Sequence, residues 1–431
     1  MWSVAFLAVL AIPSALLIWE TSRIVLAQIW GASADPAAIR RAIALDPGNA
    51  DLHCALGRVL LLDVRPGAQS EAVQEFQKAT ILNPRSAVYW SSLGKACYAS
   101  GNQTCAEAAF IRAQELAPSN PQYAWQSAVN YVVSNQPDAA VERLKMYLQL
   151  RHDGIGPSFE LLMRGFGDPK IVTHRLLAPS SDMATKLQVL SYLAGDKDFD
   201  AANDYWTELV ANKSEISVAG VTPYVDGLLA GRRYQDAAGA WRYAQGDKGL
   251  GRLPTSSEQN LVYNSGFEQD PLNGGFDWHS LQQPYVNVDF ADHNEHSGLR
   301  SILAEFTVPQ NTELEWTYQL VPVVPATTYE LTAYVESRTI TSDSGPRLRV
   351  VDPECVACLD VATPGTTGTT DWHLVTTQFT TGQKTEVIRL SLWRPRSRTY
   401  PMEISGQSWF DDISLHPAAS PIQETASRGN R

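Results

Sequence analysis

Residues 264–278, NSGFEQDPLNGGFDW, decide how this chain is divided. Glycine, asparagine and aspartate surround the aromatic residues, a composition that is typical of turns and short strands rather than of a helix. The chain before this stretch has helical periodicity, whereas the chain after it alternates between apolar and polar residues. The stretch therefore opens a second domain of a different architectural class.

The alternation after this stretch is that of half-buried strands. In VIRLSLW (387–393), Ile388, Leu390 and Leu392 share one face, and YELTAYVES (329–337) alternates in the same way. Strands of this kind belong to antiparallel sheets with one face on a core. Because such strands recur with turn signals between them, the sequence favours a β-sandwich.

Several landmarks follow one another in order across residues 260–416. They are NLVYNSGFEQD, GGFDW, HSGLRSILAEF, YQLVPVVPATTYELTAYVES, WHLVTTQFT and WFDDISL. In this order they resemble the jelly-roll carbohydrate-binding modules of the galactose-binding-like type. The resemblance implies an antiparallel jelly roll over residues 259–417, in which the first and last strands lie close together.

Three carboxylates would meet where those two strands approach each other. Glu268 lies in the first landmark, and Asp411 and Asp412 lie in the last. In the modules that the chain resembles, carboxylates at this place hold a structural calcium ion, which prefers hard oxygen ligands. Two other interpretations stay open, namely an acid/base pair, which would require a cleft, and a hydrogen-bonded strand end without metal. No other cofactor is expected.

The candidate glycan-binding residues are Tyr334, Glu336, Arg389 and Trp393, which alternate with the apolar faces of their strands. We expect them to share one outer surface, where aromatic rings stack on sugar rings and polar groups bind hydroxyls. The alternative is that these aromatic residues only pack against their neighbours.

The chain before residue 247 repeats. Pro84 and Pro118 lie 34 residues apart, and the residues between them include Gly94, Ala106 and Phe110 at regular positions. A glycine and an alanine permit two helices to cross closely, and each proline ends a helix because it cannot continue the hydrogen-bond ladder. The pattern resembles the tetratricopeptide (TPR) family over residues 36–150. The resemblance implies a solenoid over residues 31–247, whose groove binds protein partners.

The N-terminal residues 1–30 are expected to be a transmembrane anchor or a signal segment. Residues 1–19, MWSVAFLAVLAIPSALLIW, carry no charged side chain and are about long enough to span a bilayer. The basic n-region of a signal peptide is missing, so an anchor is favoured. Cleavage of the segment would instead give a secreted protein.

The five cysteines are too few for a disulfide scaffold. Cys355 and Cys358 form a C-x-x-C motif without the βαβ context of a redox enzyme or a second motif for zinc. Cys97 and Cys105 flank a predicted helix–helix turn. Disulfides in an oxidising compartment are expected for both pairs, which leaves Cys54 as a buried helix residue.

The formal net charge of −12 argues against nucleic-acid binding, which needs a basic surface. Glycine- and proline-containing residues 248–258 are expected to form a linker, and residues 418–431 a disordered tail. The expected fold class is therefore multidomain α + β, with a membrane helix, an α-helical TPR solenoid and a C-terminal antiparallel jelly roll.

This organisation predicts a non-catalytic, membrane-anchored envelope adaptor on the periplasmic or extracellular side. It would bind protein partners through the solenoid and polysaccharide through the jelly roll, in surface polysaccharide assembly or export. The alternative is a structural or protein-interaction scaffold whose jelly roll binds no sugar. A glycan-active enzyme is disfavoured, because the predicted segments use the whole chain and no catalytic motif stands out.

Overall fold

The computed structural model describes residues 2–177, 182–246, 259–291, 294–400 and 402–418. The chain divides into two compact units, Met1–Thr185 and Lys186–Arg431, so the division falls inside the helical region. The linker predicted at residues 248–258 lies outside the described residues, as does the predicted tail apart from Ala418.

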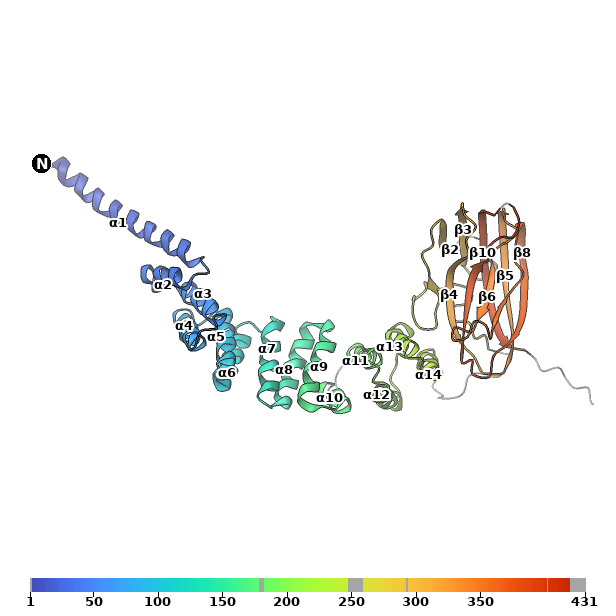
Figure 1. The fold of residues 1–431 in the computed structure, drawn as a ribbon, viewed down its shortest axis with the longest axis horizontal. Coiled ribbons are helices and arrows are strands. Elements are labelled where there is room, and N and C mark those ends of the chain that lie inside the picture. Colours follow the sequence, from blue (N-terminus) through green and yellow to red (C-terminus); the bar gives the residue numbers. More distant parts are fainter. Residues whose placement is uncertain (1, 178–181, 247–258, 292–293, 401, 419–431) are drawn as a thin grey trace, which may run out of the picture. The chain divides into compact units, whose positions relative to one another are not determined.

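The first unit is made of helices that pack in successive pairs (Figure 1). They are α1 (Trp2–Gly31), α2 (Pro36–Leu45), α3 (Ala50–Leu61), α4 (Ala68–Leu82), α5 (Ala87–Ala99), α6 (Gln103–Leu116), α7 (Pro121–Val133), α8 (Pro137–Leu150), the short 3₁₀ helix η1 (His152–Gly154), α9 (Ile155–Phe166) and α10 (Pro169–Leu176).

Small residues allow the helices of each pair to cross closely. A Cβ atom added at Gly94 of α5 would lie 2.6 Å from the ring of Phe110 in α6, and one at Gly57 of α3 would lie 2.9 Å from the ring of Phe76 in α4. Both phenylalanines are buried in one continuous core. The first unit therefore contains TPR-like helical repeats, as the sequence predicts.

The predicted membrane helix is wrong. In the part of the chain that the structure describes, no helix has both the length and the apolar character needed to cross a bilayer. Helix α1 carries an ion pair between Arg23 and Glu20 (2.7 Å). Its second half packs into the repeats, because Ala27 is only 1% exposed and lies in a small core with Ala42 and Leu52. Hydropathy summed along the sequence does not reveal these contacts.

The second unit combines four helices with two β-sheets. The helices are α11 (Met183–Gly195), α12 (Phe199–Ala211), α13 (Val218–Ala230) and α14 (Tyr234–Ala244). The strands are β1 (His279–Ser280), β2 (Val286–Ala291), β3 (Ser301–Val308), β4 (Leu314–Pro322), β5 (Thr328–Ile340), β6 (Arg347–Val351), β7 (Asp360–Ala362), β8 (Gly368–Thr380), β9 (Val387–Arg394) and β10 (Ile404–Pro417).

The strands form two five-stranded sheets, here called sheet A (order β1-β4-β9-β6-β7) and sheet B (order β2-β3-β10-β5-β8). The pairings between these strands are antiparallel. The sheets share one core, in which Trp316 of sheet A contacts Phe306 and Phe410 of sheet B with ring centres 5.2 and 6.4 Å apart. The predicted antiparallel β-sandwich is therefore present.

The last two helices contact the sandwich within the second unit. The ring of Trp241 in α14 meets the rings of Tyr263 and Phe276 edge to face, at 5.3 and 6.0 Å. Asp226 of α13 accepts a hydrogen bond from the backbone N–H of Gly275 (2.6 Å). The quoted stretch 264–278 thus opens the sandwich and also holds the final helical hairpin.

Candidate functional site

The four predicted glycan-binding residues do not share a surface. Tyr334 and Glu336 lie on β5 of sheet B, whereas Arg389 and Trp393 lie on β9 of sheet A. All four alternate with residues of the common core, so they lie on the outer faces of their sheets. Because the inner faces of the two sheets pack on each other, these outer faces point in opposite directions.

On sheet A, cations already cover the aromatic rings. Arg389 forms a two-pronged ion pair with Glu315 (2.9 and 2.6 Å), and its guanidinium lies 3.6 Å from the ring centre of Tyr318. The ring of Trp393 lies 4.6 Å from the Arg349 guanidinium, and its Nε1–H donates to Glu313 Oε1 (2.7 Å). These cation–π contacts leave less aromatic surface for a sugar.

On sheet B, the predicted residues are covered as well. The ring of Tyr334 stacks on His296 with ring centres 3.5 Å apart. Glu336 is buried and accepts a hydrogen bond from Arg338 (3.0 Å), whose guanidinium lies 4.7 Å from the ring centre of Trp409. Both predicted pairs therefore make local packing contacts, and their role in glycan binding stays a prediction.

A different aromatic residue of the sandwich is open to solvent. Tyr285 is 61% exposed and stands beside a hollow of about 270 Å³ that is also lined by Asn287, Glu305 and Thr307. Its backbone has φ = 65°, in the left-handed region that a tyrosine rarely adopts. The sequence gives little signal for this site, since Tyr285 precedes a strand and belongs to none of the landmarks.

The three predicted carboxylates do meet, around the loop at residues 296–300. A shift of register in β10 after Asp411 turns this side chain and that of Asp412 toward the loop. Asp411 Oδ2 accepts the backbone N–H groups of His296 (2.9 Å) and Ser297 (3.1 Å). Glu268 Oε1 accepts the N–H of Leu299 (2.9 Å). The carboxylates thus fasten the loop to the first and last parts of the sandwich.

The remaining contacts of these carboxylates also come from hydrogen donors. Asp412 accepts the hydroxyl of Ser297 (2.7 Å) and lies 2.6 Å from Nδ1 of His296. Burial raises the pKa of Asp411 to about 6, although the backbone N–H groups of Ser297, Asp412 and His296 oppose the rise.

Calcium needs six to eight converging oxygen atoms. Within the described ranges, no group of three or more His, Cys, Asp or Glu residues is arranged to hold a metal ion. In the described residues the three carboxylates accept hydrogen bonds from N–H and O–H groups, and the calcium site stays a prediction.

The structure joins both pairs of cysteines that the sequence singles out. Cys97 and Cys105 form a disulfide between α5 and α6 with Cα atoms 5.7 Å apart, and Cys355 and Cys358 form one with Cα atoms 5.2 Å apart. Cys54 is free and buried, and burial raises the pKa of its thiol.

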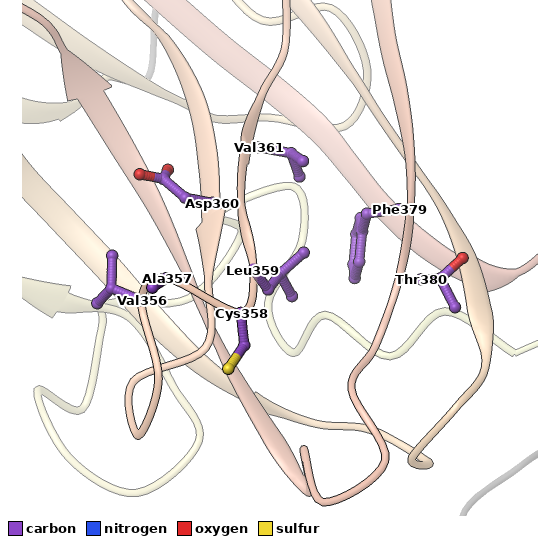
Figure 2. Close-up of a pocket in the computed structure, with 8 residues that line it drawn as sticks. All are labelled: Val356, Ala357, Cys358, Leu359, Asp360, Val361, Phe379 and Thr380. Carbon is purple, nitrogen blue, oxygen red and sulfur yellow. The ribbon is translucent and has the colours of Figure 1, made fainter.

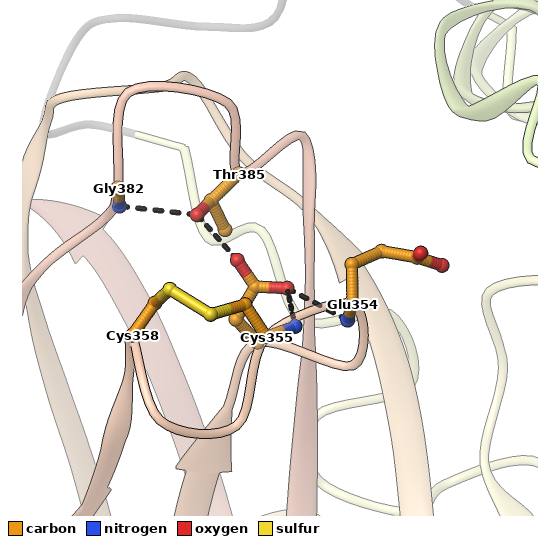
Figure 3. The surroundings of a disulfide bond; sticks show 6 residues. Glu354, Cys355, Cys358, Gly382 and Thr385 are labelled. Atoms are coloured by element: carbon orange, nitrogen blue, oxygen red, sulfur yellow. Dashed lines mark hydrogen bonds between the residues drawn. A yellow bond between two sulfur atoms is a disulfide. The ribbon is translucent and has the colours of Figure 1, made fainter.

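The loop that carries the second disulfide is held by Asp352 (Figure 3). Its carboxylate accepts the backbone N–H groups of Glu354 (2.8 Å) and Cys355 (3.2 Å) and the hydroxyl of Thr385 (2.6 Å). Glu354 then reaches the final helical hairpin, where it accepts the hydroxyl of Tyr234 (2.5 Å) and pairs with Arg232 (2.8 Å). The loop is a structural clamp of the second unit.

A hollow of about 660 Å³ lies beside this disulfide, at the edge where β7 and β8 approach each other. Leu359 and Val361 point toward Phe379 across it (Figure 2). Asp360 also lines the hollow, but its carboxylate is held by Arg349 through two hydrogen bonds of 2.8 Å. The hollow is an apolar edge without a free charge among its lining residues.

The helical repeats contain another hollow, of about 270 Å³, which lies between α5 and α7. Its lining combines apolar surface from Tyr98, Trp125 and Val129 with the exposed Lys95. Asn130 also lines it, is 1% exposed, and has a side-chain oxygen without a hydrogen-bond partner. Helical periodicity predicts the groove but cannot reveal an oxygen without a partner.

Comparisons with known proteins give partial likenesses. No family model matches the chain. Over 159 residues the chain is 24% identical to Superkiller complex protein 3 of Mus musculus, a stretch that covers 36% of this chain and 9% of that protein. The chain thus spans less than a tenth of this relative.

Among solved structures, the chain is similar to YrrB, described as a TPR protein with an unusual peptide-binding site (19% identity, 42% of this chain, 82% of that chain, TM-score 0.29). It is also similar to MamA (20% identity, 33% and 82% coverage, TM-score 0.29). A third similarity is to a family 16 carbohydrate-binding module (19% identity, 36% and 99% coverage, TM-score 0.25).

Proposed function

We propose that this chain is a non-catalytic scaffold that binds an extended segment of a partner protein in the groove between α5 and α7. The observation that carries the proposal is the open hollow of about 270 Å³ between these helices, which is lined in part by Gln122 and Gln126. Side-chain amides can both donate to and accept from the backbone of an extended peptide.

The rest of the lining suits the same ligand. Tyr98, Trp125 and Val129 offer apolar contact for a side chain of the peptide, and aromatic residues are enriched where proteins bind each other. Lys95 is exposed at the same hollow and favours an acidic residue in the partner. The expected ligand is therefore a short peptide with one large apolar and one acidic side chain.

Selection of peptides from a random display library on the full chain tests this proposal. Peptides recovered with the wild-type chain should bind Trp125→Ala and Lys95→Glu at least tenfold more weakly. Trp393→Ala is the matched control, because it removes a tryptophan from the outer face of sheet A. Peptides that bind all the variants equally, or no recovered peptides, would refute binding in this groove.

The hollow at Tyr285 supports a second candidate function, the binding of a neutral glycan by the sandwich. An exposed tyrosine ring beside the amide of Asn287, the carboxylate of Glu305 and the hydroxyl of Thr307 combines a stacking surface with hydrogen-bonding groups. A glycan array probed with the full chain should show binding that Tyr285→Ala abolishes and Trp393→Ala retains. Binding that survives in Tyr285→Ala would exclude this hollow.

The two disulfides support a location for these activities. Structural disulfides persist in oxidising compartments and are rare in the cytosol, so we propose the periplasmic or extracellular side. Thiol labelling of denatured protein taken from cells under acid quench should modify Cys54 and leave the disulfide-bonded cysteines unmodified. Labelling of all five cysteines would contradict this location.

A further inference from the structure

Four arginines gather at one end of the sandwich. Arg347 begins β6, Arg394 ends β9, and Arg396 and Arg398 follow in the next loop. The β6–β9 register pairs Arg347 with Trp393, so Arg347 lies beside the end of β9. Within the described residues none of the four forms an ion pair. We call these four residues the arginine end.

Arg394 holds the arginine end together. It is 0% exposed, and its guanidinium donates to the carbonyl oxygens of Thr312 (2.7 Å), Ser344 (3.2 Å) and Met402 (2.8 Å). These neutral acceptors join three loops, and burial lowers the pKa of Arg394. An arginine remains charged in proteins even so. Its positive charge is therefore not cancelled by a directly paired carboxylate.

Arg347 is fixed in the same region. Its Nε–H donates to the carbonyl oxygen of Gly345 (3.1 Å), and burial lowers its pKa as well. The guanidinium lies directly against Gly365, where any added Cβ atom would collide with it. The half-buried guanidinium of Arg347 therefore keeps its positive charge. Because it is already fixed in position, it loses little side-chain entropy when it binds an anion.

Arg396 and Arg398 are exposed on either side of a buried residue, Ser397. The side chain of Asn311 holds the backbone of Ser397 through two hydrogen bonds, one to its carbonyl oxygen (2.9 Å) and one from its N–H (2.8 Å). The loop is therefore anchored while both guanidinium groups face solvent.

Two acidic residues lie in the loops of the arginine end. Asp343 accepts the hydroxyls of Ser397 and Thr399 (both 2.5 Å), and these bonds lower its pKa, so it stays ionised. Glu403 is exposed after the loop. Glu313, directly before the strand that pairs with Arg394, is already paired with Arg349 (3.1 Å). The four arginines therefore outnumber the acidic residues in these loops.

We infer that the arginine end binds an anionic polysaccharide that carries carboxylate groups. The planar guanidinium group matches the two oxygens of a carboxylate. Tyr400, 86% exposed in the same loop, offers a ring on which a sugar can stack. The inference does not depend on either proposed function, since it uses neither Tyr285 nor the helical groove.

Titration of the full chain with polygalacturonate tests the inference, with dextran as the uncharged polymer and a single-stranded DNA oligonucleotide as a different polyanion. The double variant Arg396→Gln/Arg398→Gln changes only exposed side chains. Its matched control, Arg112→Gln/Arg175→Gln, removes the same charge from exposed positions in α6 and α10. We expect polygalacturonate to bind the wild type and the control alike and the double variant at least tenfold more weakly.

The binding should also weaken as salt rises from about 50 to about 300 mM, because the exposed arginines are screened. If the control and the double variant lose the same affinity for polygalacturonate, the effect comes from net charge alone, and the inference is overturned. Equal binding of dextran would overturn the role of the carboxylates, and equal binding of the oligonucleotide would overturn the assignment to polysaccharide. A peptide or neutral-glycan result at the other two sites would change none of these outcomes.

Discussion

Replacing Asp411 by asparagine should change how the stability of the sandwich depends on pH. Asp411 is 0% exposed, and its carboxylate accepts three backbone N–H groups, from His296, Ser297 and Asp412. Burial nevertheless raises its pKa from an ordinary value of 3.8 to about 6. The ionised form is therefore less favourable in the folded protein than in the unfolded chain.

The size of the effect follows from the two pKa values. Each pKa unit between them corresponds to a free energy of about 1.4 kcal/mol. At pH 7 the ionised carboxylate therefore destabilises the fold by roughly 3 kcal/mol relative to the protonated acid. Because folding raises the pKa of Asp411, its protonated form stabilises the fold fully below the unfolded pKa near 4. This stabilisation is lost as pH rises through the folded pKa of about 6. Asparagine has a similar shape and does not titrate.

Hydrogen exchange followed by mass spectrometry at the peptides of β3 and β10 measures this effect. Wild type and Asp411→Asn are compared at the same pH, so that intrinsic exchange rates cancel. The stability of the wild type relative to the variant should rise by roughly 2–3 kcal/mol as pH falls from 7 to 4. Asp289→Asn, an exposed carboxylate on β2 of the same sheet, should show no such trend. A constant difference between wild type and Asp411→Asn would refute the reasoning.

Three further changes test the helical unit. Gly94→Val should destabilise the helical unit by about 1–3 kcal/mol, because a Cβ atom there would lie 2.6 Å from the Phe110 ring. Gly48→Val is the control, because a Cβ atom there would have nothing within 4 Å. Urea unfolding followed by circular dichroism compares the two variants, and equal stability would contradict the close helix crossing. Cys97→Ser/Cys105→Ser should lower the free energy of unfolding by about 2–3 kcal/mol, because the disulfide closes a loop across a sequence separation of 8. The melting temperature of this variant is compared with that of the wild type, which is measured with and without a reductant. Equal melting temperatures would show that the disulfide adds no stability. Burial would raise the pKa of Glu75, but hydrogen bonds from Lys78 and His53 hold it below its ordinary value of 4.5. The stability that Glu75 contributes is therefore present above pH 4.5 and lost as pH falls further, and a Glu75→Gln variant unfolded in urea across this range should lack the change.

Local signals predicted the elements of both folds. Pro84 and Pro118, which lie 34 residues apart, and small residues such as Gly94 predicted the helical repeats, because those residues act within one helical pair. Alternation predicted which side of β5 and β9 faces the core, because side chains of a strand point to opposite faces. These signals depend on neighbours in sequence.

The candidate sites depended on partners far apart in sequence. Alternation does not say which sheet a strand joins, so Tyr334 and Trp393 were predicted to share one surface but lie on opposite faces. The membrane helix predicted from the apolar N-terminus was wrong, because no helix of the described residues is long and apolar enough to cross a bilayer. The oxygen of Asn130 and the arginines without ion pairs are visible only once every neighbour is placed.

The contact between Trp241 and the sandwich bears on how the protein can be shortened. The last unit of a stacked repeat array normally needs a polar outer face to remain soluble. Here Trp241 is buried against Tyr263 and Phe276, so the sandwich serves as the terminal cap of the array. A fragment that ends at residue 246 would expose this aromatic face and should aggregate. A deletion that removes the sandwich therefore also uncovers the aromatic face of the last helical hairpin.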